Sequence, residues 1–331
     1  MALTPPFEPM LAEARRVLPP DGTLPGGWIA EQKADGFRTI LFARPGHVLI
    51  QSRRGASLTP AFPDIAAAAA GLVGVGQSLV LDGELVVPHG GRLDFNELQH
   101  RARRRGVNAA RAAESRPAYL IVFDVLEASG TEQLTRPYRE RRAVLEDLFA
   151  HNVLGAPFTL CPNTLDRATA QDWLDPAWGT AGIEGAVLKG LEQPYLPGKR
   201  AWIKVRAHMT AEAVIGAVTG SPHHPLTLLL GRYNAAGDLR LVARTTPLNT
   251  AVRRDLGRRL APSGSEHPWH GRHFSAGWGT REQLEYRPVR PDLVAEFVAD
   301  TAIDAGGRYR HPVRFGRVRE DLTPDQLPLL T

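Results

Sequence analysis

The stretch EQKADGFR, residues 31–38, contains a lysine followed closely by an aspartate-glycine pair and an arginine. An amine attacks phosphorus only when it is unprotonated, and a free lysine with a pKa near ~10.4 is almost fully charged at neutral pH. Neighbouring cations and partial burial lower such a pKa. Asp35 and Gly36 predict a tight turn that brings Arg38 back toward Lys33. Lys33 is therefore a candidate nucleophile, and an ordinary solvated turn is the alternative interpretation.

Further polar residues accompany this lysine. Glu31 lies on the same side of its predicted strand as Lys33, because side chains alternate along a strand. Its carboxylate is a candidate acceptor for the exocyclic amine of a purine, or else an ordinary surface glutamate. The sequence SRRG places Arg53 and Arg54 at a strand-to-turn junction. Arg53 is a candidate ribose or phosphate ligand, and Arg54 and Asp35 are candidate contacts to nucleic acid.

A second candidate segment is LVLDGELVV, residues 79–87. It places Asp82 and Glu84 on either side of Gly83, between two apolar runs. We expect one of these carboxylates to face inward. Burying a lone carboxylate is costly, so its expected partner is a metal ion, a ribose hydroxyl or an arginine. A simple hairpin turn is the alternative.

Three later segments complete the set. Phe123 lies at the end of the apolar run LIVFD and offers a flat face to a base, although a single phenylalanine is more often a core residue. Glu184, which is followed by a glycine, is a candidate magnesium ligand because this ion prefers oxygen. In AWIKVR, Lys204 and Arg206 alternate and so face one side. Two cations there would bind a phosphate and lower the pKa of Lys33.

Composition indicates a soluble, cytoplasmic protein. The chain has 331 residues, of which 43% are hydrophobic, a length that favours two domains over one. No apolar run approaches the roughly 20 residues of a membrane span, and the first residues do not resemble a secretion signal. Cys161 is the single cysteine, so an intramolecular disulfide and a zinc site built on several thiolates are excluded.

The charge balance is compatible with a nucleic-acid partner. Lysine and arginine number 40 against 35 acidic residues, a formal charge of +5. Two arginine-rich runs occupy residues 100–111 and 308–319. Such runs are most often solvated faces. Because they flank a candidate phosphoryl-transfer site, we favour phosphate contacts, with Arg103 and Arg104 as the candidates.

The pattern of strands and helices divides the chain in two. Residues 1–206 alternate short apolar strands with helices at 62–73, from 94 onward and at 137–150, which predicts an α+β domain of mixed antiparallel sheets and helices. Residues 207–331 read as about five strands with one helix. This predicts an all-β barrel of the oligonucleotide/oligosaccharide-binding type, the OB-fold, and a β-sandwich is the alternative.

The segments EQKADGFR, SRRG, LDGELV, VFDVL, EGAVLK and WIKVR occur in the order seen in one enzyme superfamily. The chain resembles the ATP-dependent DNA ligases, which share their nucleotidyltransferase motifs with messenger RNA capping enzymes. The resemblance extends from about residue 28 to residue 321. The short length and the ending HPVRFGRVREDL are most similar to the small bacterial ligases of the ligase C type.

The resemblance implies a role for each candidate around the nucleotide. Lys33 would be the adenylated lysine, with Glu31 reading adenine and Phe123 stacked on it. Arg38 and Arg53, together with Glu84, would surround the ribose and the phosphate.

The resemblance also implies the cosubstrates and the reaction. ATP would react with Mg²⁺ or Mn²⁺ held by Glu84 and Glu184, and Lys204 and Arg206 would hold the α-phosphate. Lys33 would expel pyrophosphate from ATP, AMP would pass to a 5′-phosphate at a nick in duplex DNA, and the 3′-hydroxyl would displace AMP. We expect a monomer.

Three departures from the ligase pattern are visible. The terminal motif has Leu322 where relatives usually have lysine, so self-adenylation would be slower. Arg206 stands where many ligases have lysine, which keeps the charge and changes the geometry. No helical DNA-binding domain precedes the catalytic domain, so a repair protein would deliver the enzyme to nicks.

Alternative interpretations remain at this stage. RNA end-joining or capping shares the lysine chemistry, and a degenerate nucleic-acid-binding module without catalysis would explain Leu322. His267, His270 and His273 have a spacing compatible with metal binding, but we interpret their segment as a barrel loop.

Overall fold

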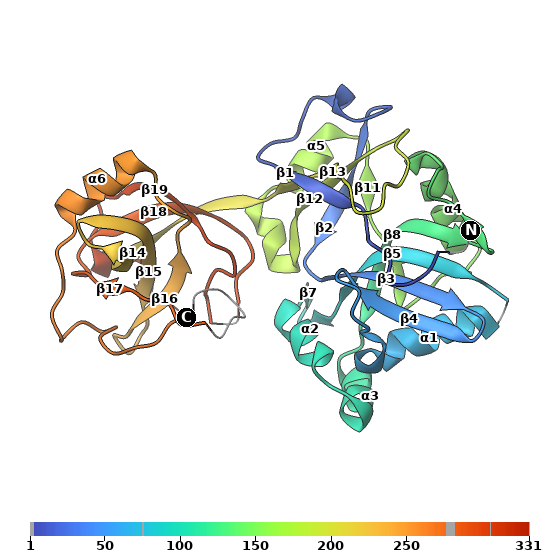
Figure 1. Cartoon of the computed structure of the whole chain (residues 1–331), viewed down its shortest axis with the longest axis horizontal. Coiled ribbons are helices and arrows are strands. Elements are labelled where there is room, and N and C mark those ends of the chain that lie inside the picture. The colour runs from blue at the N-terminus through green and yellow to red at the C-terminus, as the bar shows by residue number, and fades with distance from the viewer. Residues whose placement is uncertain (1–2, 75, 276–281, 305, 331) are drawn as a thin grey trace. The chain divides into compact units, whose positions relative to one another are not determined.

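The structure, a computed structural model, describes residues 3–74, 76–275, 282–304 and 306–330. The chain divides into two compact units, Met1–Ala207 and His208–Thr331 (Figure 1). The division therefore follows Ala207, whereas the sequence places it after Arg206.

The first unit contains a five-stranded sheet. In spatial order its strands are β1 (Leu11–Arg15), β13 (Arg200–Arg206), β12 (Ile183–Gly190), β2 (Trp28–Ala34) and β11 (Asn163–Thr164). The pair β1–β13 is parallel and the other pairs are antiparallel. One face of this sheet packs Trp28 and Ile203 against Trp173, which follows the short helix α5 (Arg167–Asp172).

A second sheet of the first unit has six strands. Its path is β10 (Phe158–Leu160), β8 (Tyr119–Ala128), β5 (Leu79–Val86), β3 (Phe37–Arg44) and β4 (His47–Ser52), and β9 (Thr131–Glu132) pairs with β8. The pair β10–β8 is parallel. Both large sheets thus contain one parallel pair among antiparallel ones, so the α+β domain with antiparallel sheets that the sequence predicted is present, with one parallel pair added to each sheet. A two-stranded ribbon, β6 (Pro88–His89) and β7 (Arg92–Leu93), completes the strands of the unit.

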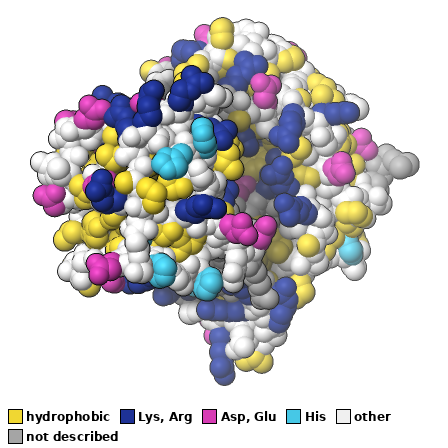
Figure 2. Space-filling model, turned by 60° about the vertical axis from the view of Figure 1, so that its left-hand side comes forward, with side chains coloured by type: hydrophobic (Ala, Val, Ile, Leu, Met, Phe, Trp, Pro, Cys, Tyr) yellow, Lys and Arg dark blue, Asp and Glu magenta, His cyan; other side chains and the backbone are white. Residues whose placement is uncertain are grey.

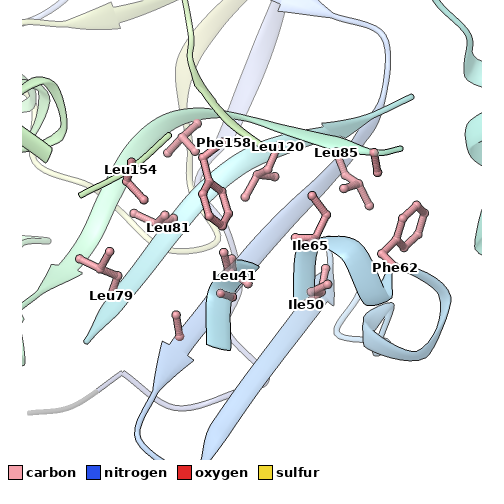
Figure 3. Packing of buried hydrophobic residues seen from close by; sticks show 14 of the residues in the cluster. Leu41, Ile50, Phe62, Ile65, Leu79, Leu81, Leu85, Leu120, Leu154 and Phe158 are labelled. Carbon is pink, nitrogen blue, oxygen red and sulfur yellow. The ribbon is translucent and has the colours of Figure 1, made fainter. Parts of the chain in front are cut away.

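Helices cover the outer face of the second sheet. Helices α1 (Pro63–Gly74), α2 (Phe95–Ala102) and α4 (Tyr138–Ala150) contribute residues to the apolar cluster on this face, and α3 (Gly106–Ser115) packs against α1. Figure 3 shows Ile65 of α1 directed into the same apolar interior as Leu41, Leu81 and Leu120 of the strands. Helix α1 begins with Pro63, whose fixed φ suits a first helical turn, and the alanines that follow favour helix.

The two sheets face each other across a second apolar cluster. Ile40 and Val80 of the second sheet meet Trp202 and Val187 of the first. We call the sides that face each other the inner faces. Because side chains alternate along a strand, each inner-face residue has its neighbours on the outer side. On β13, for example, Trp202 is inner, whereas Ile203 belongs to the outer cluster.

The arginine-rich run at 100–111, for which the sequence favours phosphate contacts over a solvated face, is not wholly at the surface. It bends between α2 and α3, and Arg101 is fully buried. The Arg101 guanidinium donates to both carboxylate oxygens of Asp64 at 2.9 Å. A buried, doubly hydrogen-bonded arginine is a structural residue, so only its neighbours remain on the surface.

The second unit is a β-structure with one helix. Its strands are, in spatial order, β16 (Leu239–Arg244), β15 (His224–Tyr233), β14 (His208–Ser221), β18 (Val294–Asp300) and β19 (Arg314–Val318), with β17 (Arg287–Pro288) beside β14. Helix α6 (Thr250–Arg259) follows β16. A parallel bridge joins Thr245 to Val313, and the Val313 N–H donates to the Arg244 carbonyl at 2.9 Å. This isolated bridge lies just after β16 and just before β19, so it brings the two outermost strands of the sheet together at that point.

The histidine-rich segment covers one side of this sheet. Trp269 is fully buried against Gly216 of β14 and Gly231 of β15. His267 is also buried, and its Nδ1 accepts from the Trp269 N–H at 3.0 Å. Within the described ranges, no group of three or more His, Cys, Asp or Glu residues is arranged to hold a metal ion. Among the helices of these same ranges, none has the length and apolar character of a membrane span.

Candidate active site

The hairpin of β2 and β3 positions Lys33. Lys33 lies on the inner face of β2, with about a fifth (21%) of its side chain exposed. The turn that follows contains Asp35 and Gly36. A Cβ on Gly36 would lie 2.4 Å from the carbonyl oxygen of Leu85. Only glycine allows this turn to pack so closely on β5, which explains the Asp-Gly sequence after the lysine.

Glu184 meets the lysine from the neighbouring strand. Lys33 Nζ donates to Glu184 Oε2 at 2.5 Å. The pairing of β12 with β2 shifts between Ile183 and Ala186, which is a β-bulge. At its centre Gly185 has φ +134°, and a Cβ there would lie 2.2 Å from the Val205 carbonyl. The bulge accompanies the turn of Glu184 toward Lys33, and it requires glycine.

A group of cations adjoins this pair. Arg206 is the last residue of β13, and its Nε lies 3.9 Å from Glu184 Oε2. Burial lowers the pKa of Lys204, and the positive charges of Arg206, Lys33 and Arg53 lower it further. The other three cations are therefore close enough to Lys204 to repel it. An anion such as a phosphate would relieve that repulsion.

A second carboxylate belongs to the same neighbourhood. Burial raises the pKa of Glu84 to about 8; Asp35 and Glu184 also raise it, whereas Lys33 and Arg38 lower it. A half-buried carboxyl with such a pKa binds a proton readily and would equally accept a metal cation. Glu84 and Glu184 are thus two carboxylates near Lys33, and carboxylate oxygens are the ligand type that Mg²⁺ and Mn²⁺ prefer.

Arg38 is held more tightly than the sequence suggests. Its guanidinium donates to both oxygens of Asp82, at 2.9 and 2.6 Å. The Tyr195 hydroxyl donates to the same carboxylate at 2.6 Å. Arg38 also lies over the rings of Phe123 and Trp202, at 5.2 and 4.9 Å from their centroids.

Both carboxylates of the DGE segment face inward, which corrects the expectation of one. Asp82 is fully buried and Glu84 is half-buried. Residues two apart on a strand share a face, so both belong to the inner side of β5. The arginine expected as a partner for a buried carboxylate is Arg38.

Glu31 and Phe123 belong to a buried polar group next to this site. Glu31 is only 2% exposed, and its Oε2 lies 2.7 Å from Lys189 Nζ. The same ammonium group donates to the Phe123 carbonyl at 2.8 Å and lies 4.6 Å from the Phe123 ring centroid. Phe123 lies in the middle of β8 and not at the end of a strand as expected. The strand continues past Asp124 through its pairing with β5 and β9, and the Asp124 carboxylate is paired with Arg141 at 2.8 Å.

Several residues of the site were not singled out by the sequence: Asp82 as the Arg38 partner, Tyr138, Lys189, Tyr195 and Trp202. Lys189 did carry a signal, because it ends the quoted motif EGAVLK, five residues after Glu184. It is also two residues after Val187, so alternation places both on the same face of the strand. Tyr138 lies in the helix predicted at 137–150, but neither Tyr138 nor Tyr195 carried a sequence signal for the site, and only the fold brings them to Glu31 and Asp82.

The candidate DNA contacts lie elsewhere on the first unit. Arg54 and Arg103 are exposed, and Arg104 pairs with Glu97 at 3.9 Å. Asp35, in contrast, is at the Lys33 turn, and its backbone N–H donates to the Gly182 carbonyl at 2.9 Å. Figure 2 shows Lys and Arg side chains over much of the visible face, with Asp and Glu among them. The charged surface is therefore mixed in sign.

The terminal motif is built into the second unit. Arg319 donates to both carboxylate oxygens of Asp321, at 2.8 and 2.7 Å, and to Glu212 at 3.0 Å. Leu322 packs against the cluster that contains Trp269. An apolar residue is thus accommodated at position 322 by packing.

A lysine beside two carboxylates and three further cations, between the inner faces of two sheets, is typical of a covalent nucleotidyltransferase. The family model of the ATP-dependent DNA ligase domain matches residues 9–206. The chain belongs to the ATP-dependent DNA ligase family.

Curated relatives agree over nearly the whole length. DNA ligase C2 of Mycolicibacterium smegmatis is 34% identical, over 97% of this chain and 92% of that protein. DNA ligase C of Mycobacterium tuberculosis is 32% identical, over 98% of this chain and 93% of that protein. The family assignment therefore covers both units.

Solved structures give the same result. The ligase domain of LigD from M. tuberculosis has a TM-score of 0.51 and 28% identity, covering 97% of this chain and 98% of that one. A mycobacterial DNA ligase D solved with ATP has a TM-score of 0.52 and 27% identity, with 98% of each chain covered. This protein is an ATP-dependent DNA ligase that uses ATP as cosubstrate with a divalent metal ion.

Proposed function

We propose that the chain seals nicks in duplex DNA with Lys33 as the residue that carries AMP. The observation that supports this most directly is the position of Lys33 Nζ, which lies 2.5 Å from Glu184 Oε2, the same oxygen that Arg206 Nε approaches to 3.9 Å, and which is close enough to Lys204 to lower the pKa of that lysine. A nucleophile for an α-phosphate needs such cations, because they bind the phosphate and its developing charge.

Three transfers follow. The Lys33 amine loses a proton and forms a bond to the α-phosphorus of ATP, while the bond to pyrophosphate breaks. An oxygen of the 5′-phosphate at the nick then attacks the AMP phosphorus, and the bond to Lys33 breaks. Finally the 3′-hydroxyl loses a proton and attacks the 5′-phosphorus, and AMP leaves.

The remaining inner-face residues would bind the nucleotide. Lys204, Arg206 and Arg53 would contact the α-phosphate and ribose. A metal ion held by Glu84 and Glu184 would neutralise negative charge on the phosphates.

The base and ribose would be bound by the adjacent polar group. Phe123 would stack on adenine and Glu31 would read its edge. Arg38, oriented by Asp82, would contact the ribose or phosphate.

We further propose that the second unit is an OB-fold barrel. Its strand order, the bridge between Thr245 and Val313, and a helix between the third and fourth long strands support this. DNA would be contacted by Asp35, Arg54, Arg103 and Arg104 of the first unit. We also propose, by analogy with the family, that the enzyme works in the cytoplasm as a monomer and that a repair protein brings it to nicks.

The test is incubation of wild type and Lys33→Ala with α-labelled ATP and Mg²⁺, followed by addition of nicked DNA or a nicked RNA-containing duplex. We expect covalent label on wild type only, discharged with sealing of nicked DNA. Label from GTP alone would indicate a capping enzyme, and sealing of RNA alone an RNA ligase. Absence of label, together with failure to seal pre-adenylated nicked DNA, would contradict the proposal.

A further inference from the structure

Tyr138 makes a direct contact with the carboxylate proposed to read adenine. The Tyr138 hydroxyl lies 2.5 Å from Glu31 Oε1, although the two residues are 107 positions apart. Both are buried, with 1% and 2% of their surfaces exposed. Tyr138 is the first residue of α4, and its backbone N–H donates to the Gln193 carbonyl at 2.9 Å. The hydroxyl is therefore presented from a fixed point of the backbone.

The other oxygen of Glu31 is held from a different element. Lys189 Nζ of β12 lies 2.7 Å from Oε2, and Arg142 Nη1 of α4 lies 3.6 Å from Oε1. Two donors at opposite oxygens fix the plane of a carboxylate. Each oxygen retains a second lone pair, because a carboxylate accepts about four hydrogen bonds in total.

The contact determines what the carboxylate can recognise. An ionised carboxylate only accepts hydrogen bonds, so it suits the 6-amino group of adenine and repels the 6-oxo group of guanine or hypoxanthine. A protonated carboxyl, in contrast, has an O–H that can donate to a 6-oxo group. Donors directed at both oxygens favour the ionised form.

We propose that Tyr138 is a positioning residue that holds the Glu31 carboxylate as a pure acceptor and thereby contributes to the selection of ATP over 6-oxopurine triphosphates. This inference rests on the proposed function, because it assumes that Glu31 faces the base during adenylation of Lys33. Burial raises the pKa of Glu31 above its ordinary value, and Lys189, Tyr138 and Arg142 lower it by less than burial raises it. Loss of the Tyr138 hydroxyl removes one of the influences that oppose protonation.

The experiment compares α-labelled ATP with α-labelled inosine triphosphate, which carries a 6-oxo group. We expect wild type to prefer ATP. In Tyr138→Phe the ratio of kcat/KM for ATP to that for inosine triphosphate should fall about tenfold, the usual size of one lost hydrogen bond. The change should appear as a higher KM for ATP and a lower KM for inosine triphosphate, with kcat for ATP within about threefold of wild type.

Tyr195→Phe is the matched control. It also removes a buried tyrosine hydroxyl from a carboxylate, but that carboxylate is Asp82, which holds Arg38. Its activity should change without a change in the preference for ATP. A purely structural effect of losing a buried hydroxyl would move both variants alike, so equal ratios in Tyr138→Phe and Tyr195→Phe would overturn the inference.

Two further outcomes separate the inference from the proposed function. A wild type labelled equally by both nucleotides would show that Glu31 does not read the base, which overturns the inference and leaves the ligase proposal intact. A wild type that ATP does not label would overturn the proposed function and the inference with it.

If Tyr138→Phe does not fold, Glu31→Gln tests the same carboxylate. The glutamine amide both donates and accepts hydrogen bonds, so an unchanged ratio of kcat/KM for ATP to that for inosine triphosphate would again refute the inference.

Discussion

Lys33 Nζ and Glu184 Oε2 are 2.5 Å apart, although 151 positions separate the two residues in the chain. The contact joins neighbouring strands of one sheet, and it exists because the bulge in β12 accompanies the turn of Glu184 toward β2. The nucleophile and its carboxylate therefore depend on strand register. A shift of one residue would move Glu184 to the opposite face.

The first prediction concerns the charge of Glu184. Glu184→Gln retains the size of the side chain but removes the anion that accepts from Lys33 and that would bind the metal. We expect the rate of self-adenylation to fall by about 100-fold, as for the loss of one electrostatic group in other active sites. The measurement is the single-turnover rate of label transfer from α-labelled ATP.

The control for Glu184→Gln is Glu13→Gln. Glu13 is 58% exposed in an ion pair with Arg15, and surface pairs of this kind contribute little. Glu13→Gln should label like wild type. If Glu184→Gln also labels at the wild-type rate while Lys33→Ala does not, the carboxylate has no part in the transfer.

The second prediction concerns Gly185. In Gly185→Ala the new Cβ would lie 2.2 Å from the Val205 carbonyl, at φ +134°, so the bulge must rearrange. We expect loss of self-adenylation and a decrease of about 2 kcal/mol or more in the free energy of unfolding. Self-adenylation and urea unfolding are measured on the same preparation.

Gly71→Ala is the control for this change. Gly71 lies in α1, and no atom is within 4 Å of the point that a Cβ would occupy, so alanine should be tolerated or slightly stabilising. Wild-type activity in Gly185→Ala would show that the bulge does not orient Glu184.

The sequence predicted the elements that carry the site. Short apolar runs bounded by glycine and proline predicted β2, β12 and β13, and period-two alternation placed Lys204 and Arg206 on one side, where the structure also has them near Lys33. These predictions depend only on local spacing. The strand β1, the parallel pairs and the bulge at Gly185 depend on which strands become neighbours, and local spacing does not determine that.

The partners of the buried charges were also beyond the sequence. Asp82 with Arg38, and Asp64 with Arg101, join segments 44 and 37 residues apart. The sequence suggested an arginine partner for the DGE carboxylate but could not choose among many arginines. Arg101 belongs to the run for which the sequence favoured phosphate contacts, and those contacts require exposure, whereas Arg101 is buried against Asp64.

The third prediction is a pH dependence of stability. Burial raises the pKa of Asp64, but hydrogen bonds from Arg101 and from the Ala118 N–H lower it more, so its pKa is below the ordinary value. A carboxylate of this kind stabilises the fold above its unfolded pKa, near ~3.9, and loses that effect as the pH falls through the folded pKa. Asp64→Asn should therefore cost about 3 kcal/mol at pH 7, because it leaves the buried Arg101 unpaired.

The difference in stability between wild type and Asp64→Asn should remain constant from pH 7 to about 5 and shrink below about pH 4. Urea unfolding across this range is the measurement. Asp21→Asn, at an 80% exposed aspartate paired with Arg167, is the control and should stay near wild type throughout. A difference that does not change with pH would show that the ion pair is not the cause.

The fourth prediction concerns the packing of Trp269 on the second unit. A Cβ on Gly216 would lie 2.4 Å from Trp269 Cζ3. The indole cannot move away easily, because its N–H donates to the Leu239 carbonyl at 2.7 Å and the ring is fully buried. Gly216→Ala should therefore reduce the free energy of unfolding by about 2 kcal/mol through overpacking.

Calorimetric unfolding of four variants distinguishes overpacking from a backbone effect at Gly216. Gly264→Ala, at a glycine with nothing within 4 Å, should unfold like wild type. Trp269→Ala alone should be strongly destabilising, by about 3–5 kcal/mol, because it leaves a cavity. In the Trp269→Ala background, however, Gly216→Ala should have almost no further effect, since the clashing ring is gone and residues in contact are not additive. A penalty for Gly216→Ala of the same size in both backgrounds would instead mean that β14 needs glycine for its own conformation, and that Trp269 only fills the space beside it.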